Sequence, residues 1–328
     1  MLREIWPFAD AHHRAGRPVV LARLVGRDGP GSRPLGATMA VAGDGTWRGS
    51  LSGGCVEGIV LEKAREVLAG TAPHVTTVSP GEHLLPWEEA PACAGDLRVL
   101  VVAAPPEPVH SAITTALTED RPLAVRVQLR PPYTWSVAAT VSRLPDDGPA
   151  HTEELGQRPR LLLVGATDLA AVLAALAAPL HRRTVVLDPR PAHAASGAFP
   201  APVTAVRTWP DEWITRHPLD AHDAVVALSH DPRIDDRALR AALTGPAGYV
   251  AALGSRTTHA QRLRRLAGTP GLDRLHGPAG LDLGGTSLAE SALSILAELV
   301  AAGNGRSGRP LRDGDLPIRA TALSHGGA

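Results

Sequence analysis

A cysteine stands behind two glycines at the start of a predicted helix, in the stretch SLSGGCVEGIVLEKAREVLAG at residues 50–70. The chain has only two cysteines, so this placement invites a chemical explanation. Ser52, Gly53 and Gly54 precede the helix, where backbone N–H groups lack helical partners and can face an anion. A cysteine in the first helical turn favours the thiolate, the reactive and metal-binding form. The alternative is that Cys55 is a small, buried hydrophobic residue.

A second loop of similar composition, GSRPLGATM, occupies residues 31–39. Residues 38–50 are predicted to form a hairpin with its turn at Gly43-Asp44-Gly45, so the two loops flank the hairpin and are expected at the same end of it. The candidate ligand-binding residues of this half are Gly31, Ser32, Arg33, Gly36, Ser52, Gly53, Gly54 and Glu57.

The second half alternates strand-like and helix-like segments. This pattern predicts a doubly wound parallel sheet with helices on both faces, in which ligands bind beyond the carboxyl ends of the strands. The expected strands lie at 160–165, 184–188, 203–209, 223–229 and 248–255.

The first strand-to-helix turn of this sheet resembles an eroded dinucleotide site. Asp188 follows Gly165 by 23 residues, near the spacing at which a carboxylate binds a ribose hydroxyl. However, Thr167 and Ala170 stand where the fingerprint needs glycines. Asp168 suits a helix start but repels a phosphate. Nucleotide binding therefore stays an open alternative.

Two further turns carry candidate residues. His230 and Asp231 follow a predicted strand, either as a ligand-facing pair or as a capped turn with a solvated histidine. Ser255 and Arg256 begin a predicted helix, where an anion is favoured, although helix capping alone also explains the serine. The remaining candidates of this half are Arg190, Gly254, Gly280 and Asp282.

These patterns predict an α/β protein, with an amino-terminal mixed α/β domain followed by a Rossmann-like doubly wound parallel-sheet domain. The expected boundaries are 1–147 and 159–305 for the domains, 148–158 for a polar linker, and 306–328 for a flexible tail.

Composition excludes several classes of partner. Lys+Arg and Asp+Glu number 33 each, which argues against binding to nucleic acid or to a membrane surface. The longest apolar runs are shorter than the roughly 20 residues of a membrane span, and no signal peptide is recognisable. Two cysteines make no disulfide framework, and a cytoplasmic protein is expected.

The motifs taken together resemble the XdhC/CoxI family of accessory proteins for molybdenum hydroxylases. In the first half the resemblance rests on GSRPLGATMAV and LSGGCVEG. In the second half it rests on LLLVGA, VVLDPR, SHDPRIDDRAL, YVAALGSRTTHAQRLRRL and GLDLGGTSLAESALSILAEL.

The resemblance implies a cofactor-binding chaperone rather than a turnover enzyme. Family members are thought to bind the molybdenum cofactor in its molybdopterin form, to protect it while a cysteine desulfurase supplies its sulfido ligand, and to pass it to an apo molybdenum hydroxylase. They are usually homodimers. By motif, Cys55 becomes a thiol near the cofactor, with a molybdenum contact, and Cys93 in APACAGDLRV becomes a second thiol.

Departures from the family pattern keep two alternatives open. The family's glycine turn is GATDLA here, and its Cys-Gly-Gly is Cys93-Ala94-Gly95. One alternative is an NAD(P)-dependent oxidoreductase that uses the Rossmann-like domain. The other is a scaffold that bridges the desulfurase and the hydroxylase without a small-molecule ligand.

Overall fold

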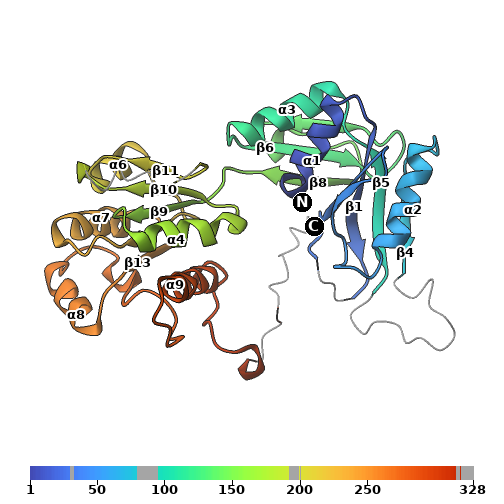
Figure 1. The fold of residues 1–328 in the computed structure, drawn as a ribbon. Coiled ribbons are helices and arrows are strands. Elements are labelled where there is room, and N and C mark those ends of the chain that lie inside the picture. The colour runs from blue at the N-terminus through green and yellow to red at the C-terminus, as the bar shows by residue number, and fades with distance from the viewer. Residues whose placement is uncertain (30–32, 80–94, 192–198, 200, 315–317, 319–328) are drawn as a thin grey trace. The chain divides into compact units, whose positions relative to one another are not determined.

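The computed structural model describes residues 1–29, 33–79, 95–191, 199, 201–314 and 318 (Figure 1). The chain divides into two compact units, Met1–Gln157 and Arg158–Ala328. Each unit is built around its own sheet or sheets and its own hydrophobic cores.

The amino-terminal unit contains a five-stranded antiparallel sheet and a three-stranded antiparallel sheet. In spatial order the larger sheet comprises β3 (Trp47–Gly49), β2 (Thr38–Ala42), β1 (Val19–Arg27), β5 (Leu97–Ala103) and β4 (His74–Val78). The smaller sheet comprises β7 (Trp135–Ala138), β6 (Leu123–Gln128) and β8 (Ala150–Leu155). The helices are α1 (Leu2–Arg14), α2 (Glu57–Leu68) and α3 (Glu107–Thr118).

Alternation along β1 separates two cores, because successive side chains of a strand point to opposite faces. Val20 and Leu24 pack with α2 on one face. Val19 and Leu21 pack on the other face, where α1, α3 and the smaller sheet contribute the rest of the core. The predicted hairpin is the pair β2–β3, and Gly45 in its turn has φ +84°.

The segment expected as a linker is largely strand β8. Residues 150–155 pair with β6 inside the amino-terminal unit, and the division between the units falls after Gln157. The segment looked like a linker because it is polar, but Glu153 on its inward face is buried and pairs with a buried cation.

The carboxy-terminal unit contains a six-stranded parallel sheet. Its spatial order is β11 (Thr204–Val206), β10 (Arg183–Leu187), β9 (Arg160–Val164), β12 (Ala224–Ala227), β13 (Tyr249–Ala252) and β14 (Leu275–His276). Counted from β9, this is the order 3-2-1-4-5-6 of dinucleotide-binding domains. The predicted doubly wound parallel sheet is confirmed.

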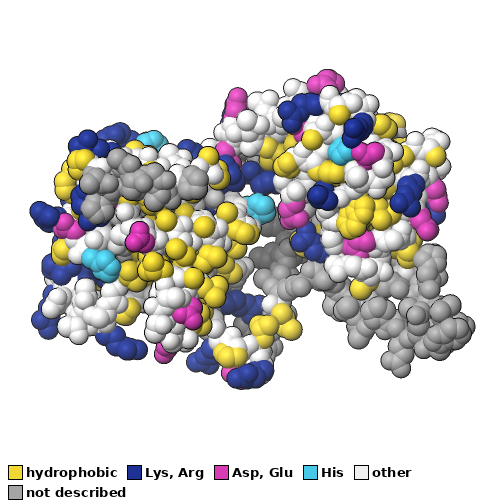
Figure 2. Space-filling view, viewed as in Figure 1, with side chains coloured by type: hydrophobic (Ala, Val, Ile, Leu, Met, Phe, Trp, Pro, Cys, Tyr) yellow, Lys and Arg dark blue, Asp and Glu magenta, His cyan; other side chains and the backbone are white. Residues whose placement is uncertain are grey.

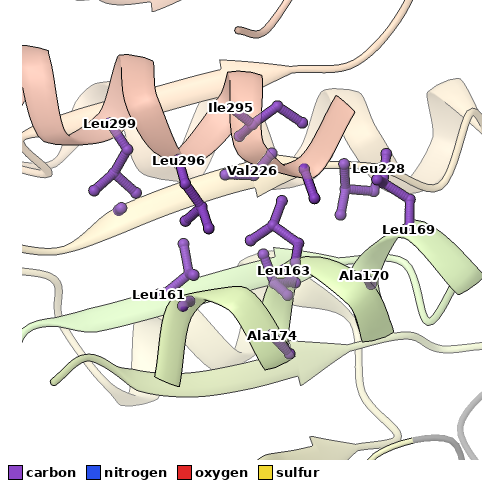
Figure 3. Close-up of a cluster of buried hydrophobic side chains, with 14 of the residues drawn as sticks. Leu161, Leu163, Leu169, Ala170, Ala174, Val226, Leu228, Ile295, Leu296 and Leu299 are labelled. Carbon is purple, nitrogen blue, oxygen red and sulfur yellow. The ribbon is translucent and has the colours of Figure 1, made fainter. Parts of the chain in front are cut away.

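Helices cover both faces of this sheet. Figure 3 shows Leu161, Leu163 and Val226 on one face of the sheet, packed against α4 (Asp168–Ala177) and α9 (Leu288–Gly303). The opposite face packs against α6 (Pro210–Arg216) and α7 (Pro232–Thr244), and α8 (Arg256–Arg265) lies beside α7.

No helix among the described residues is long and apolar enough to cross a membrane.

Candidate functional site

The candidate residues of the amino-terminal unit lie at one edge of the five-stranded sheet, where β1 and β3 end and β2 and β5 begin. Arg23 lies opposite Thr38, and Met39 lies opposite Gly49, while β5 begins opposite the end of β1. The segments that precede β2 and β5 and those that follow β1 and β3 therefore leave the sheet at the same edge. The described candidates in these segments are Arg33, Gly36, Ser52, Gly53, Gly54 and Cys55.

Three predicted residues, Gly31, Ser32 and Cys93, lie outside the described residues. Gly95, two positions after Cys93, is described and packs against the chain after β1. A Cβ at Gly95 would lie 1.4 Å from the backbone oxygen of Asp28, so only glycine fits there.

The first loop at this edge is held by an ion pair, a hydrogen bond to its backbone and a glycine with positive φ. Arg33 forms an ion pair with Glu4 at 2.5 Å, and the backbone oxygen of Arg33 accepts a hydrogen bond from Arg27 at 2.8 Å. Gly36 has φ +85°, and a Cβ there would lie 3.1 Å from Nε2 of His151. The guanidinium of Arg33 is therefore already paired with a carboxylate of its own chain.

The second loop presents Cys55 to solvent. Cys55 is exposed and not disulfide-bonded, so the alternative of a buried packing cysteine is wrong. Its backbone N–H donates to the Ser52 hydroxyl at 2.9 Å. The thiol therefore stands at the surface on a loop whose backbone is fixed by a neighbouring side chain.

The backbone N–H groups of this loop are not free, contrary to the sequence prediction. They donate to the carboxylate of Glu57, which is only 7% exposed. Burial opposes ionisation, but hydrogen bonds from Ser52, Ser50 and Leu51 outweigh it and lower the pKa of Glu57 to about 2. The Glu57 carboxylate is therefore satisfied inside the loop.

A buried charge cluster that the sequence did not reveal lies behind the first loop. Arg23 on β1 is fully buried and forms an ion pair with Glu153 on β8. Glu153 also accepts the backbone N–H of Leu2 at 3.0 Å, which ties the start of α1 to β8. Burial, together with the positive charge of Arg23, lowers the pKa of the neighbouring His151 to about 3, so this imidazole is neutral at pH 7.

In the carboxy-terminal unit, β9 and β12 meet at the point where the strand order reverses, which is where such sheets bind ligands. Gly165 at the end of β9 has φ +107°, and a Cβ there would lie 2.7 Å from the backbone of Ser229 at the end of β12. The two turns are therefore in close contact at this point.

The Asp188 carboxylate, which was expected to bind a ribose hydroxyl, already accepts hydrogen bonds from its own chain. Asp188 is 1% exposed and accepts the Ala166 N–H at 2.8 Å. It also accepts two side-chain hydrogen bonds from Arg190, at 2.9 and 2.7 Å. Burial opposes ionisation of Asp188, but these donors outweigh it and lower its pKa. Asp188 and Arg190 thus satisfy each other at the position where a nucleotide would need the carboxylate.

His230 and Asp231 occupy a capped turn. His230 has φ +61° and is exposed. Asp231 caps α7 by accepting the Arg233 N–H at 2.9 Å, and it pairs with the Arg233 side chain at 2.7 Å. Hydrogen bonds from Arg233 lower the pKa of Asp231 to about 2. This geometry is that of the capped turn with a solvated histidine.

A buried cation on α8, which the sequence did not single out, lies behind the turn after β13. Ser255 caps α8 by accepting the Thr258 N–H at 3.1 Å, and Arg256 is exposed. Arg262 is buried, donates to the Leu253 oxygen at 2.9 Å and lies 3.9 Å from Asp235. A Cβ at Gly254 would lie 3.7 Å from Arg262, so this guanidinium backs the turn.

Gly280 and Asp282 lie in the segment between β14 and α9. The Gly280 N–H donates to Glu298 on α9 at 2.7 Å, and a Cβ at Gly280 would lie 2.4 Å from the Ser294 hydroxyl. Asp282 is exposed. Gly280 is therefore fixed against α9.

The same unit exposes an apolar face on α4 and α9 (Figure 2). Leu293 is 55% exposed, and Leu176 and Val300 are also exposed. A cavity of about 1250 Å³ lies over these side chains, and residues 306–311, 313 and 314 of the segment expected as a flexible tail (306–328) form part of its wall. In the part of the chain that the structure describes, no group of three or more His, Cys, Asp or Glu side chains could hold a metal ion.

Comparisons with known proteins identify the family to which the chain belongs. Residues 12–79 match the model of the XdhC and CoxI family, and residues 161–299 match that of the XdhC Rossmann domain. The two segments together cover more than half of the chain. The chain belongs to the XdhC/CoxI family. The first match includes the whole Cys55 loop, whereas Cys93 lies in neither match.

Two relatives of similar length agree with this assignment, and one solved structure shares the fold. The molybdenum cofactor insertion chaperone PaoD of Escherichia coli (strain K12) is 27% identical, over 91% of this chain and 88% of its own length. A probable xanthine dehydrogenase subunit of Bacillus subtilis (strain 168) is 25% identical, over 86% of this chain and 92% of its own. A crystal structure described as a xanthine dehydrogenase from Bacillus halodurans shares the fold of this XdhC/CoxI chain, with a TM-score of 0.76 and 22% identity over 92% of this chain and 96% of that one.

Proposed function

We propose that this chain binds the molybdenum cofactor as cargo and delivers it to a molybdenum hydroxylase, without turnover of its own. The observation that carries the proposal is the exposed thiol of Cys55, presented by a fixed loop at the sheet edge where the family-matched loops leave the sheet. The similarity to the molybdenum cofactor insertion chaperone of Escherichia coli supports the same function.

The residues present fit a molybdenum-containing cargo. A thiolate is a soft ligand, of the kind that binds transition metals through sulfur. Cys55 is exposed, so a bulky ligand can reach the sulfur without opening of the core. A single thiol contact also leaves the cargo exchangeable, in contrast to a closed four-ligand site. In this proposal Cys55 holds the cargo and the hydroxylase removes it.

The geometry disfavours the NAD(P)-dependent alternative. The Asp188 carboxylate is paired with Arg190, and the Ala166 N–H is taken by Asp188. A dinucleotide would have to break these contacts before it could form its own. We therefore expect calorimetric titration with NAD(H) or NADP(H) to give no heat of binding at millimolar nucleotide.

An activation assay tests the proposed function. Apo molybdenum hydroxylase is mixed with molybdenum cofactor in the presence and absence of this chain, and the activity gained is followed with time. A carrier that delivers the cofactor is expected to raise the initial rate of activation by at least about tenfold, equivalent to roughly 1.4 kcal/mol. Equal rates with and without the chain are incompatible with delivery.

Three more detailed expectations about this chain remain predictions. These are sulfuration of the bound cofactor by a cysteine desulfurase, assembly of the chain as a homodimer, and a second thiol at Cys93. Pull-down of a desulfurase by the purified chain, and its mass by light scattering, test the first two.

A further inference from the structure

The Cys55 loop forms a cage around one carboxylate. We call its backbone donors the N–H nest: the N–H groups of residues 51–54 and 56. They donate to the two carboxylate oxygens of Glu57 at 2.8–3.3 Å. The hydroxyls of Ser50 and Ser52 add hydrogen bonds at 2.7 and 2.6 Å. An ionised carboxylate with this many donors is held strongly, because hydrogen bonds to charged groups are the strong ones.

The backbone of the loop is shaped for this purpose. Gly53 has φ +89° and Gly54 has φ +130°, values that residues with a Cβ rarely adopt. Successive N–H groups that converge in this way form a concave anion site of the kind that holds phosphates in other proteins. Here the anion is part of the chain.

A chain of contacts connects this carboxylate to the cysteine. The Ser52 hydroxyl donates to Glu57 and accepts the backbone N–H of Cys55 at 2.9 Å. It also lies 3.1 Å from the backbone nitrogen of Val56. The position of Glu57 therefore sets the orientation of the Ser52 hydroxyl, which in turn fixes the backbone that carries the thiol.

A ligand phosphate is at a disadvantage in this nest. The carboxylate of Glu57 is tethered next to the donors, so its effective concentration there greatly exceeds that of a free anion. Displacement would also leave a buried carboxylate without its donors, which is costly.

We propose that Glu57 is the internal ligand of the N–H nest and the positioning residue of Cys55, so that cargo meets this loop through the thiol and not through an oxyanion contact. The identity of the cargo rests on the proposed function, but the role of Glu57 does not. Glu57, predicted as a cofactor ligand, thereby becomes the residue that shapes the site.

Chemical rescue tests the role of Glu57 without any molybdenum cofactor. The variants Glu57→Ala and Glu57→Gln are made in a Cys93→Ser background, so that Cys55 is the remaining cysteine, and alkylation by iodoacetamide is followed by mass spectrometry. Loss of the carboxylate frees the backbone that carries the thiol and so increases access to the sulfur, and alkylation in Glu57→Ala is therefore expected to be ~3- to 10-fold faster. Formate should refill the nest and return the rate of Glu57→Ala towards that of the parent.

The controls separate positioning from general damage. Glu62→Ala removes an exposed carboxylate from the same helix and should leave the rate unchanged. Phosphate should slow alkylation in Glu57→Ala but not in the parent. Circular dichroism confirms that each variant is folded. If Glu57→Ala unfolds, Glu57→Gln is used for the alkylation rate alone, because its side chain still occupies the nest and leaves no room for formate. An unchanged rate in the folded variant, absence of formate rescue in a folded Glu57→Ala, or slowing of the parent by phosphate would each overturn the proposal.

These outcomes are independent of the proposed function. Cofactor binding with no formate rescue retains the carrier and rejects the role of Glu57, and formate rescue without cofactor binding does the reverse.

Discussion

Replacement of Arg23 by alanine is expected to lower the free energy of unfolding by about 3–5 kcal/mol. The side chain is fully buried and pairs with Glu153, so its removal leaves a carboxylate uncompensated between two sheets. The measurement is equilibrium denaturation of the full chain followed by tryptophan fluorescence. Trp135 reports on this site, because its ring centroid lies 5.9 Å from the guanidinium carbon of Arg23.

Two further variants show whether the loss of stability comes from breaking the ion pair between Arg23 and Glu153. Arg98→Ala truncates an exposed arginine of β5 and should change stability by no more than about 0.5 kcal/mol. The double variant Arg23→Met with Glu153→Met removes both charges and should recover part of the loss, because the hydrogen bond from the Leu2 N–H to Glu153 is lost as well. A decrease of less than about 1 kcal/mol in the free energy of unfolding of Arg23→Ala would contradict the role of this buried ion pair in stability.

Replacement of Cys55 by alanine should reduce activation of the apo hydroxylase at least about tenfold, or roughly 1.4 kcal/mol. The same variant should leave the free energy of unfolding within about 0.5 kcal/mol, because the side chain is exposed. The activation assay measures the first effect, and equilibrium denaturation of the same preparation measures the free energy of unfolding.

Cys55→Ser and Cys93→Ser complete this comparison. Serine preserves the size of the side chain but not the soft sulfur ligand, so Cys55→Ser should behave like Cys55→Ala. Cys93→Ser shows whether the second predicted thiol contributes separately. Full activation by both Cys55 variants would demote Cys55 to a surface residue.

Most of the fold could be predicted because its strands are apolar runs of the expected length. β1, β5, β9 and β12 follow directly from such runs, and the alternation of strands and helices after residue 160 indicated the parallel sheet. The helix α1 was missed although Leu2, Ile5, Trp6 and Ala9 are buried at helical spacing, because Pro7 lies inside the helix and charged residues stand between the apolar positions.

β8 was missed for a different reason. Its inward face includes Glu153, and a buried charge looks like a loop residue until its partner is known. That partner, Arg23, lies on β1 and is distant in sequence. The alternation that places Val19 and Leu21 on one face also places Arg23 there, and this was the available signal.

The candidate site was predicted in part. The spacing around the hairpin correctly placed the two loops at one edge of the sheet. It did not show that the N–H nest is already filled. The signal was present, because an acidic residue in the first turn of a helix can reach back to the N–H groups before it. Likewise, the spacing of Asp188 suggested a ribose, but Arg190 two residues later takes the carboxylate.

The central claim is that this chain binds the molybdenum cofactor, and its most direct test is stoichiometry. The purified chain is mixed with the cofactor and separated by gel filtration, and molybdenum in the protein peak is measured by mass spectrometry. We predict about one molybdenum per wild-type chain and a markedly lower content for Cys55→Ala, because a site of this kind holds one ligand. A wild-type peak that contains no molybdenum would contradict the account.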